Sequence, residues 1–264
     1  MLNIKSINKN FNKETLNEVT IFNNFSLEIN KGDFITIVGS NGAGKSTLLN
    51  IISGSLDVDS GNIILEGKDI TRLKEHKRSK FIARVFQDPT KGTSPSMTIL
   101  ENLSLADNKG KSFGFSLGVN KKKLEEFKDQ LSILNLGLED KINTKVGMLS
   151  GGQRQALSLL MATLKTPQVL LLDEHTAALD PKTSENIIEL TDKIVKEKKI
   201  TTVMITHNLN HAIVFGNRLL MMHRGEKILD IGERDKKVLT KNALVEEFNK
   251  ITFKEDLSDR VMSA

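Results

Sequence analysis

The stretch of this 264-residue chain that decides its fold reads GSNGAGKST, and its residues are Gly39, Ser40, Asn41, Gly42, Ala43, Gly44, Lys45, Ser46 and Thr47. It satisfies the phosphate-loop pattern G-x-x-x-x-G-K-[ST], which requires a strand before it and a helix after it. The apolar segment 33–38 precedes the loop, and an apolar helical pattern runs from Lys45 to a glycine stop at Gly54. Strand, loop and helix are therefore predicted in the required order.

The residue types of this loop indicate its chemistry. Glycines let the backbone curl so that its N–H groups face phosphates, and the helix start adds a favourable dipole. Lys45 is expected to place its charge on the β- and γ-phosphates, and Ser46 to offer its hydroxyl to Mg²⁺. We therefore predict that all nine residues surround the phosphates of a nucleotide.

A second motif, QVLLLDE, spans residues 168–174 and joins an apolar strand to two acidic residues. Such a strand delivers Asp173 to its carboxyl end, where α/β sheets bind their ligands. There Asp173 can hold Mg²⁺ with its water shell, and Glu174 can polarise an attacking water molecule. Many buried strands end in aspartate, so the motif is informative because it follows a phosphate loop.

A third motif, LSGGQRQ, begins at Leu149 and opens another apolar helical pattern. Ser150 is predicted to be the N-cap of that helix, and Gly151 and Gly152 leave backbone N–H groups bare. The chain thus has a second helix start suited to an anion. If the two starts lie on opposite lobes, one nucleotide cannot use both starts of the same chain.

The order of periodic segments indicates the fold class. Residues 1–30 alternate apolar and polar positions, and residues 61–70 read as another strand pair, so an antiparallel sheet is predicted. The pattern becomes helical from about 88 to 165. Strand and helix patterns then alternate again, with strands at 168–174 and 200–206, a helix at 181–196 and a hairpin at 218–231.

These patterns predict an α/β fold of the P-loop NTPase class with a mostly parallel core sheet. An N-terminal antiparallel β subdomain and an inserted helical subdomain, at about 88–165, complete the expected domain of residues 1–250. Within the insertion we expect a loop over 108–119 and an amphipathic segment over 121–134. Residues 251–264 are expected to form a C-terminal tail.

Composition excludes several classes of protein. Hydrophobic residues make up 38% and charged residues 27%, which are ordinary values for a globular chain, and the lack of cysteine excludes disulfides. No signal peptide or membrane-spanning run is expected, so work at a membrane would need another chain as anchor. The net charge is +5, but the basic run at 120–123 is followed by two glutamates and the chain has no Tyr or Trp. We therefore expect no nucleic-acid partner.

Taken together, the three motifs resemble those of the ABC ATPases, and the likeness runs from about residue 2 to residue 250. The segment Leu-Ser-Gly-Gly-Gln matches the family's signature sequence, which closes over the γ-phosphate of ATP held by the other subunit. The resemblance implies a homodimeric ATPase that binds ATP and Mg²⁺. In it, Ser150, Gly151, Gly152 and Gln153 would face the ATP of the partner copy.

The resemblance assigns roles to four further positions. Gln87, in VFQDP, matches the glutamine loop that touches Mg²⁺ or the water and senses the permease. Asp180 belongs to the loop that crosses the dimer seam, and His207 matches the switch histidine that contacts the γ-phosphate. Phe11 falls where the family places an aromatic ring on adenine. The predicted catalytic residues are therefore Glu174, His207 and Gln87, and the predicted metal ligands are Ser46, Gln87 and Asp173.

One departure from the family pattern is informative. Most relatives have proline after the catalytic glutamate, whereas this chain has His175 in DEHTAALDP. With Glu174 in extended backbone, the His175 side chain points to the opposite side, so we expect it to be dispensable for chemistry. The pattern resembles importer ATPases paired with solute-binding lipoproteins, some of them linked to aromatic amino-acid uptake.

The resemblance implies solute import through a separate transmembrane permease, with this chain held peripherally at the cytoplasmic face of the membrane. The alternatives are the ATPase subunit of an exporter and a soluble ABC-type ATPase outside transport. Soluble relatives usually carry a long coiled coil or two cassettes, and neither is present in this sequence. A non-catalytic nucleotide switch would be expected to lack Glu174 or His207, and the chain has both.

Overall fold

The core of the protein is a six-stranded sheet, seen in a computed structural model that describes residues 1–110, 118–119 and 121–250. Its strand order is β10-β9-β3-β8-β7-β6. The bounds are β3 Phe34–Gly39, β6 Ile82–Val85, β7 Val169–Asp173, β8 Thr201–Ile205, β9 Arg218–His223 and β10 Glu226–Ile231. All neighbours run parallel except β9 and β10. The central strands are almost wholly buried, as parallel strands covered on both faces must be.

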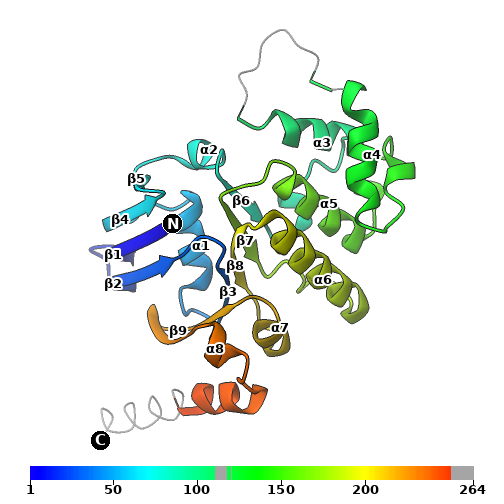
Figure 1. Cartoon of the computed structure of the whole chain (residues 1–264). Helices are drawn as coiled ribbons and strands as arrows, with labels where there is room; N and C mark the ends of the chain where they lie inside the picture. The colour runs from blue at the N-terminus through cyan, green and yellow to red at the C-terminus, as the bar shows by residue number, and fades with distance from the viewer. Residues whose placement is uncertain (111–117, 120, 251–264) are drawn as a thin grey trace, which may run out of the picture.

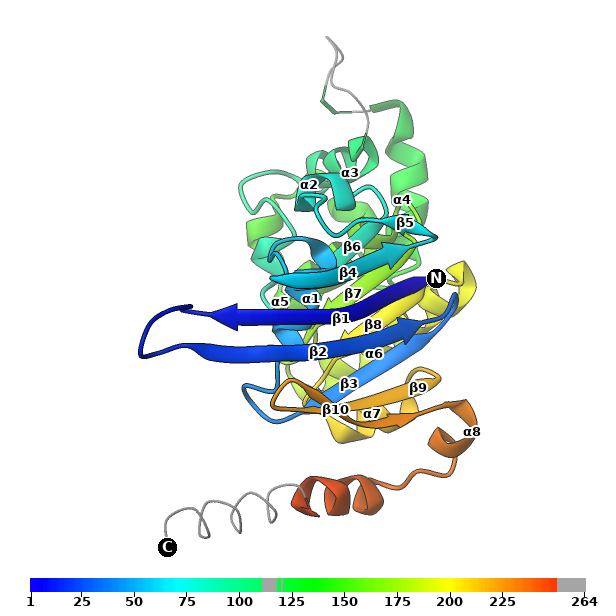
Figure 2. The ribbon, with the colours of Figure 1, turned by 90° about the vertical axis from the view of Figure 1, so that its left-hand side faces the viewer.

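A second, antiparallel sheet covers one face of the core. Its order is β2-β1-β4-β5, with β1 Leu2–Phe11, β2 Val19–Ile29, β4 Ser60–Leu65 and β5 Lys68–Asp69. Helix α1, Lys45–Ser53, shares one hydrophobic cluster with strands of both sheets, so its apolar residues are buried all round. Figure 2 shows the long β1–β2 ribbon crossing in front of the core strands.

A separate lobe is built from helices. It contains α3 Ile99–Asn108, α4 Leu124–Ser132 and α5 Gly151–Thr163, with 3₁₀ turns at Pro89–Lys91, Lys121–Lys123, Glu139–Lys141 and Val146–Met148. These elements enclose their own hydrophobic cluster, centred on residues such as Leu103, Phe127 and Leu157. Figure 1 shows this lobe beside the sheets, with α5 nearer the core strands than α4.

The remaining helices lie outside the helical lobe. They are α2 Glu75–Arg78, α6 Pro181–Lys198, α7 Leu209–Val214 and α8 Glu233–Lys236, and residues 241–250 are also helical. Arg78 of α2 is buried and donates hydrogen bonds to the carbonyl oxygens of Ile51 and Ile52. Because helix C-terminal carbonyls lack partners within the helix, this guanidinium satisfies and charge-compensates the end of α1.

The predicted fold class is confirmed, as are the strand pair near 61–70 and the hairpin at 218–231. The short strand β6 and helix α7 had not been predicted. The expected 108–119 loop lies largely outside the described residues, as does the expected 251–264 tail. The bounds of the helical subdomain and of the 1–250 domain stay predictions. None of the described helices has the length and apolar character needed to cross a membrane.

Candidate nucleotide site

The loop between β3 and α1 is shaped by its glycines. A Cβ on Gly39 would lie 2.1 Å from the carbonyl oxygen of Met222 on β9, so no other residue fits there. Gly44 is the N-cap of α1 at φ 90°, a left-handed conformation that side chains disfavour. Gly44 has no side chain with which to cap α1. The first N–H groups of α1 therefore receive no cap from this residue and are suited to an anion.

Lys45 lies within this loop and is almost fully buried. Its Nζ donates hydrogen bonds of 2.8 Å to the carbonyl oxygens of both Gly39 and Ser40. Desolvation lowers the pKa of Lys45, while the negative charges of Glu174 and Asp173 oppose that shift. The fold thus gathers the loop lysine and both acidic residues of the second motif into one electrostatic neighbourhood.

Asp173, at the end of β7, is held by a residue that sequence reasoning missed. Arg84 of β6 donates from Nη2 to Asp173 Oδ2 at 2.5 Å and from Nη1 to Asn50 Oδ1 at 2.7 Å. Both side chains of the ion pair are largely buried. No sequence signal joins residues 84 and 173, which meet only because β6 and β7 are neighbours. Gln87 lines a cavity of about 470 Å³ together with Asp173, Asn50 and Arg84.

Glu174 and His207 are brought together from neighbouring strand ends. His207 Nε2 lies 2.6 Å from Glu174 Oε1, and both residues line a second cavity of about 410 Å³. The prediction that Glu174 has an extended backbone is wrong, because the φ angle of this residue is 48°. A left-handed non-glycine residue is strained, and such strain concentrates at functional sites. Backbone hydrogen bonds on both sides hold it, from Glu174 N–H to Ile205 and from Ala177 N–H to Glu174.

His175 points away from these cavities into the protein. It is 2% exposed, and its Nε2 lies 3.1 Å from Thr191 Oγ1 on α6. The Thr191 hydroxyl donates to the carbonyl oxygen of Ile187, so it accepts the bond from His175, which therefore carries its proton on Nε2. Burial lowers the pKa of His175 to about 3, with a smaller contribution from the nearby His211.

The predicted N-cap of the third motif is confirmed at the start of α5. Ser150 Oγ accepts from the Gln153 N–H, and Gln153 Oε1 accepts from the Ser150 N–H, which makes a reciprocal capping box. A Cβ on Gly152 would lie 2.3 Å from Thr183 Cγ2, so this glycine lets α5 pack against the start of α6. The helix start belongs to the helical lobe, whose hydrophobic cluster is separate from that of the phosphate loop.

Two further residues have a structural role as well as a predicted site role. Asp180 is the N-cap of α6, and hydrogen bonds from the Thr183 hydroxyl and N–H lower the pKa of its carboxyl group. Phe11 ends β1 with 37% of its surface exposed, and the Lys9 ammonium lies 5.3 Å from its ring centroid. Its ring is thus available for stacking, with a cation already on one side.

The three residues predicted to be metal ligands carry oxygen donors of the kind that suits a magnesium ion. Ser46 supplies a hydroxyl, Gln87 an amide oxygen and Asp173 a carboxylate, and hard oxygen ligands of this kind are those that Mg²⁺ prefers. Among the described residues, no group of three or more His, Cys, Asp or Glu side chains could hold a metal. This donor set matches the usual Mg²⁺ arrangement, in which a few protein oxygens are completed by phosphates and water.

Comparisons with known proteins agree with this geometry. Residues 22–177 match the family described as ABC transporter. A tyrosine transport ATP-binding protein of Clostridioides difficile is 53% identical over 248 residues, which cover 94% of this chain and 98% of that protein. The spermidine/putrescine import ATP-binding protein PotA of Haemophilus influenzae is 34% identical over 89% of this chain, which spans 59% of the PotA length.

A solved structure extends the likeness to three dimensions. The dimeric ATP-binding cassette MJ0796, in a post-hydrolysis state with ADP and Pi, superposes with a TM-score of 0.75 at 30% identity. The match covers 89% of this chain and 99% of that one. The chain therefore belongs to the ABC transporter family. It is an ATP-binding subunit that hydrolyses ATP.

Replacing His175 by glutamine is expected to keep kcat for ATP hydrolysis within about tenfold of wild type, or roughly 1.4 kcal/mol in barrier. The imidazole faces Thr191 rather than the cavity of Glu174, and a glutamine amide can still donate to the threonine hydroxyl. Steady-state phosphate release measures this directly. Proline is a poorer probe, because it favours extended backbone with a negative φ at the preceding residue, whereas Glu174 has a φ of 48°. A loss of a hundredfold or more in the glutamine variant would place His175 in the mechanism.

The same histidine is expected to make stability depend on pH. Its folded pKa of about 3 is below the unfolded value near 6.5, so the unfolded chain binds the extra proton. The free energy of unfolding should therefore fall as pH drops from about 6.5 towards 3. Urea unfolding at pH 7.5 and pH 5 should show a smaller acid loss in His175→Gln than in wild type. Equal losses in both proteins would contradict the assignment.

Proposed function

We propose that this chain energises the import of an aromatic amino acid, with tyrosine as the first candidate, through a separate transmembrane permease. The observation that carries the proposal is the 53% identity to a tyrosine transport ATP-binding protein over nearly the whole length of both chains. The DEHTAALDP segment supports the same assignment. We further propose a solute-binding lipoprotein as the third component, and a position at the cytoplasmic face of the membrane.

Nucleotide binding is assigned to the loop and its neighbours. The N–H groups of residues 39–47 and the Lys45 ammonium would surround the phosphates, which would draw the ammonium from its present carbonyl partners. Ser46, Gln87 and Asp173 would hold Mg²⁺, which neutralises charge on the phosphoryl oxygens when bound. Arg84 keeps Asp173 oriented towards the same cavity as Gln87. Phe11 would stack on the adenine ring.

Hydrolysis is assigned to Glu174 and His207. Glu174 would accept a proton from the attacking water, whose oxygen bonds to the γ-phosphorus while the bond to the bridging oxygen of ADP breaks. The 2.6 Å contact between Glu174 Oε1 and His207 Nε2 orients the carboxylate. His207 would then stabilise charge on the transferred phosphoryl group. The left-handed backbone at Glu174 sets the direction in which its side chain leaves the main chain.

The complete site is proposed to need two copies of the chain. The start of α5 is a capped helix end on the helical lobe, with N–H groups suited to a phosphate. In a twofold dimer, Ser150, Gly151, Gly152 and Gln153 would close over the ATP held by the partner's loop, while Asp180 lies at the seam. The dimeric cassette matched above supports this arrangement. We assign the whole unit to residues 1–250, with the helical subdomain at about 88–165 and a tail at 251–264.

Transport measurements in the organism that carries this chain test the proposed substrate. Deleting the gene should lower uptake of labelled tyrosine, and the wild-type gene should restore it, whereas a Glu174→Gln copy should not. Labelled spermidine and methionine serve as matched controls and should be unaffected. If tyrosine uptake is unchanged and uptake of spermidine or methionine is lost, that solute would replace tyrosine as the proposed substrate. Accumulation of tyrosine inside the deletion strain would indicate an exporter instead.

A further inference from the structure

A cavity of about 750 Å³ lies at the end of the core sheet opposite the nucleotide loop. It is bordered by Phe34 at the start of β3 and by Ile200 just before β8, whereas the nucleotide site follows the far ends of these strands. Helices α6, α7 and α8 and the loops next to them contribute the remaining walls. Its volume falls in the range of small-molecule sites, about 300–1,000 Å³.

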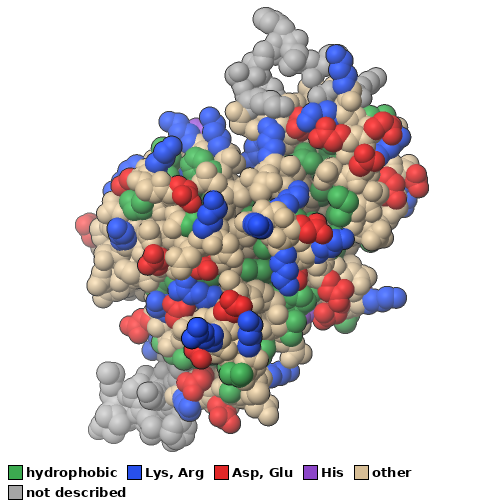
Figure 3. Space-filling model, viewed as in Figure 1, with side chains coloured by type: hydrophobic (Ala, Val, Ile, Leu, Met, Phe, Trp, Pro, Cys, Tyr) green, Lys and Arg blue, Asp and Glu red, His purple; other side chains and the backbone are tan. Residues whose placement is uncertain are grey.

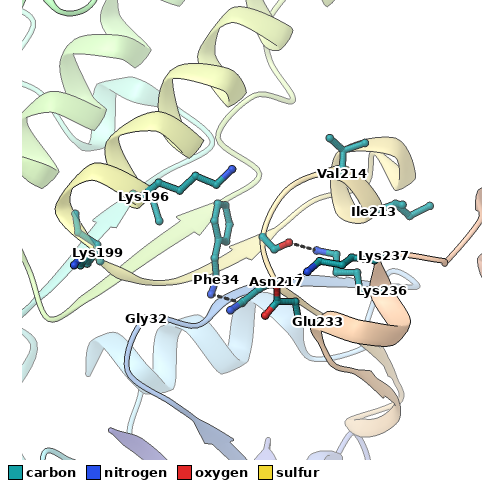
Figure 4. A pocket seen from close by; sticks show the side chains of 13 residues that line it. Gly32, Phe34, Lys196, Lys199, Ile213, Val214, Asn217, Glu233, Lys236 and Lys237 are labelled. Atoms are coloured by element: carbon teal, nitrogen blue, oxygen red, sulfur yellow. Dashed lines mark hydrogen bonds and ion pairs between the residues drawn. The ribbon is translucent and has the colours of Figure 1, made fainter.

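Part of the lining of this cavity is apolar. The ring of Phe34 and the side chains of Ile213 and Val214 line it, together with Val195 and Ile200. Figure 4 shows Phe34 on one side of the space and the α7 residues Ile213 and Val214 on the other. Val214 leaves 70% of its surface exposed. The wall therefore offers apolar area to an incoming molecule.

The charged residues on the lining are mostly basic. Four lysines line the cavity against one glutamate, and they are Lys196, Lys199, Lys236 and Lys237. Lys196 pairs with Asp192, and Lys237 pairs with Glu233. Figure 4 places Lys196 beside Phe34, with Lys236 and Lys237 on the opposite side.

Lys236 is the distinctive member of this group. It is only 4% exposed, and its Nζ donates to the carbonyl oxygens of Phe215 and Gly216 and to the Thr36 hydroxyl. No ion pair joins it to an acidic side chain in the described part of the chain. Burial lowers its pKa to about 8. A buried cation with only neutral acceptors gains from an anion, which would replace one of its 3.2 Å contacts with a neutral oxygen by a contact with an opposite charge.

We propose that this cavity binds a small organic anion, a carboxylate with a flat or branched apolar body, at a site separate from the nucleotide. The carboxylate would approach Lys236, and the apolar body would cover the half-buried Ile213 and the exposed Val214. An anion without an apolar body would make only the contact with the Lys236 ammonium. A neutral analogue would make only the apolar contacts. The site is independent of which solute the transporter moves.

A fluorescent carboxylate tests the proposal in the full chain. The protein has no Trp or Tyr, so the emission of 2-naphthoate can be followed without protein background. It should bind one molecule per chain, and 2-naphthalenemethanol, its neutral counterpart, should bind at least about tenfold more weakly. Inorganic phosphate at equal concentration should displace little of it. Saturating MgATP should leave binding unchanged, because the nucleotide occupies the other end of the sheet.

Two variants and a matched control locate the site. Lys236→Met should weaken 2-naphthoate binding by about tenfold or more, because the charge-assisted contact is lost. Val214→Asp should weaken it similarly, and its exposed position leaves the fold intact. Val238, which is 79% exposed and outside the cavity lining, provides the control Val238→Asp, which should match wild type. Equal binding by Val214→Asp and wild type, equal binding of the neutral analogue, or displacement by MgATP would each overturn the proposal.

Discussion

Replacing Glu174 by glutamine should lower kcat for MgATP hydrolysis by about 10²–10⁴-fold, the usual contribution of a general base. The amide keeps nearly the same shape but cannot accept the proton of the attacking water. ATP affinity should survive, because the substitution also removes a negative charge beside the γ-phosphate. Single-turnover release of labelled phosphate separates the chemical step from binding.

The control for this variant is Glu189→Gln, which makes the same chemical change at an exposed position of α6. It should hydrolyse ATP at the wild-type rate. A Glu174→Gln protein that also keeps the wild-type rate would remove this carboxylate from the mechanism. The contact with His207 would then have only a structural meaning.

Lys45→Ala should weaken ATP binding by on the order of 100-fold, because one charge-assisted contact with the phosphates is lost. The effect should be large because the ammonium is already buried within the loop, where charge interactions are screened little. Calorimetric titration with ATP measures the change. Equal affinity of wild type and variant would refute the role of Lys45.

Ser46→Ala provides the matched control for Lys45→Ala. It keeps the lysine and removes a proposed metal ligand, so ADP binding without Mg²⁺ should be close to wild type. Binding of MgATP by the same variant should fall. Thermal unfolding of each variant shows whether the loop stays folded, because Lys45 also bonds to the carbonyl oxygens of Gly39 and Ser40.

Sequence alone predicted the parts of the site that depend on local signals. The phosphate loop, the cap at Ser150 and the glycine stop of α1 at Gly54 each need only a few neighbouring residues, and the structure has all three. The strands β3, β7 and β8 were predictable for the same reason. Each is a short apolar run that is followed by glycine or by polar residues.

Features that depend on distant residues were not predictable in this way. Strand β6 has only four residues and is defined by its pairing with β7, about 87 positions further along the chain. The hydrogen bond from Arg84 to Asp173 follows from that pairing, and no sequence pattern indicates it. The left-handed backbone of Glu174 was missed because glutamate seldom adopts it, so no propensity rule indicates it.

In the proposed dimer, ATP is held between the phosphate loop of one chain and the α5 start of another. Light scattering after size exclusion tests it with Glu174→Gln, in which ATP should remain uncleaved. With MgATP the mass should be twice the 29.4 kDa of the chain, and with ADP it should be 29.4 kDa. Adding Ser150→Arg should abolish the shift, and adding Ser132→Arg, at the exposed end of α4, should not. A Glu174→Gln protein that binds ATP but stays monomeric at saturation would contradict the claim.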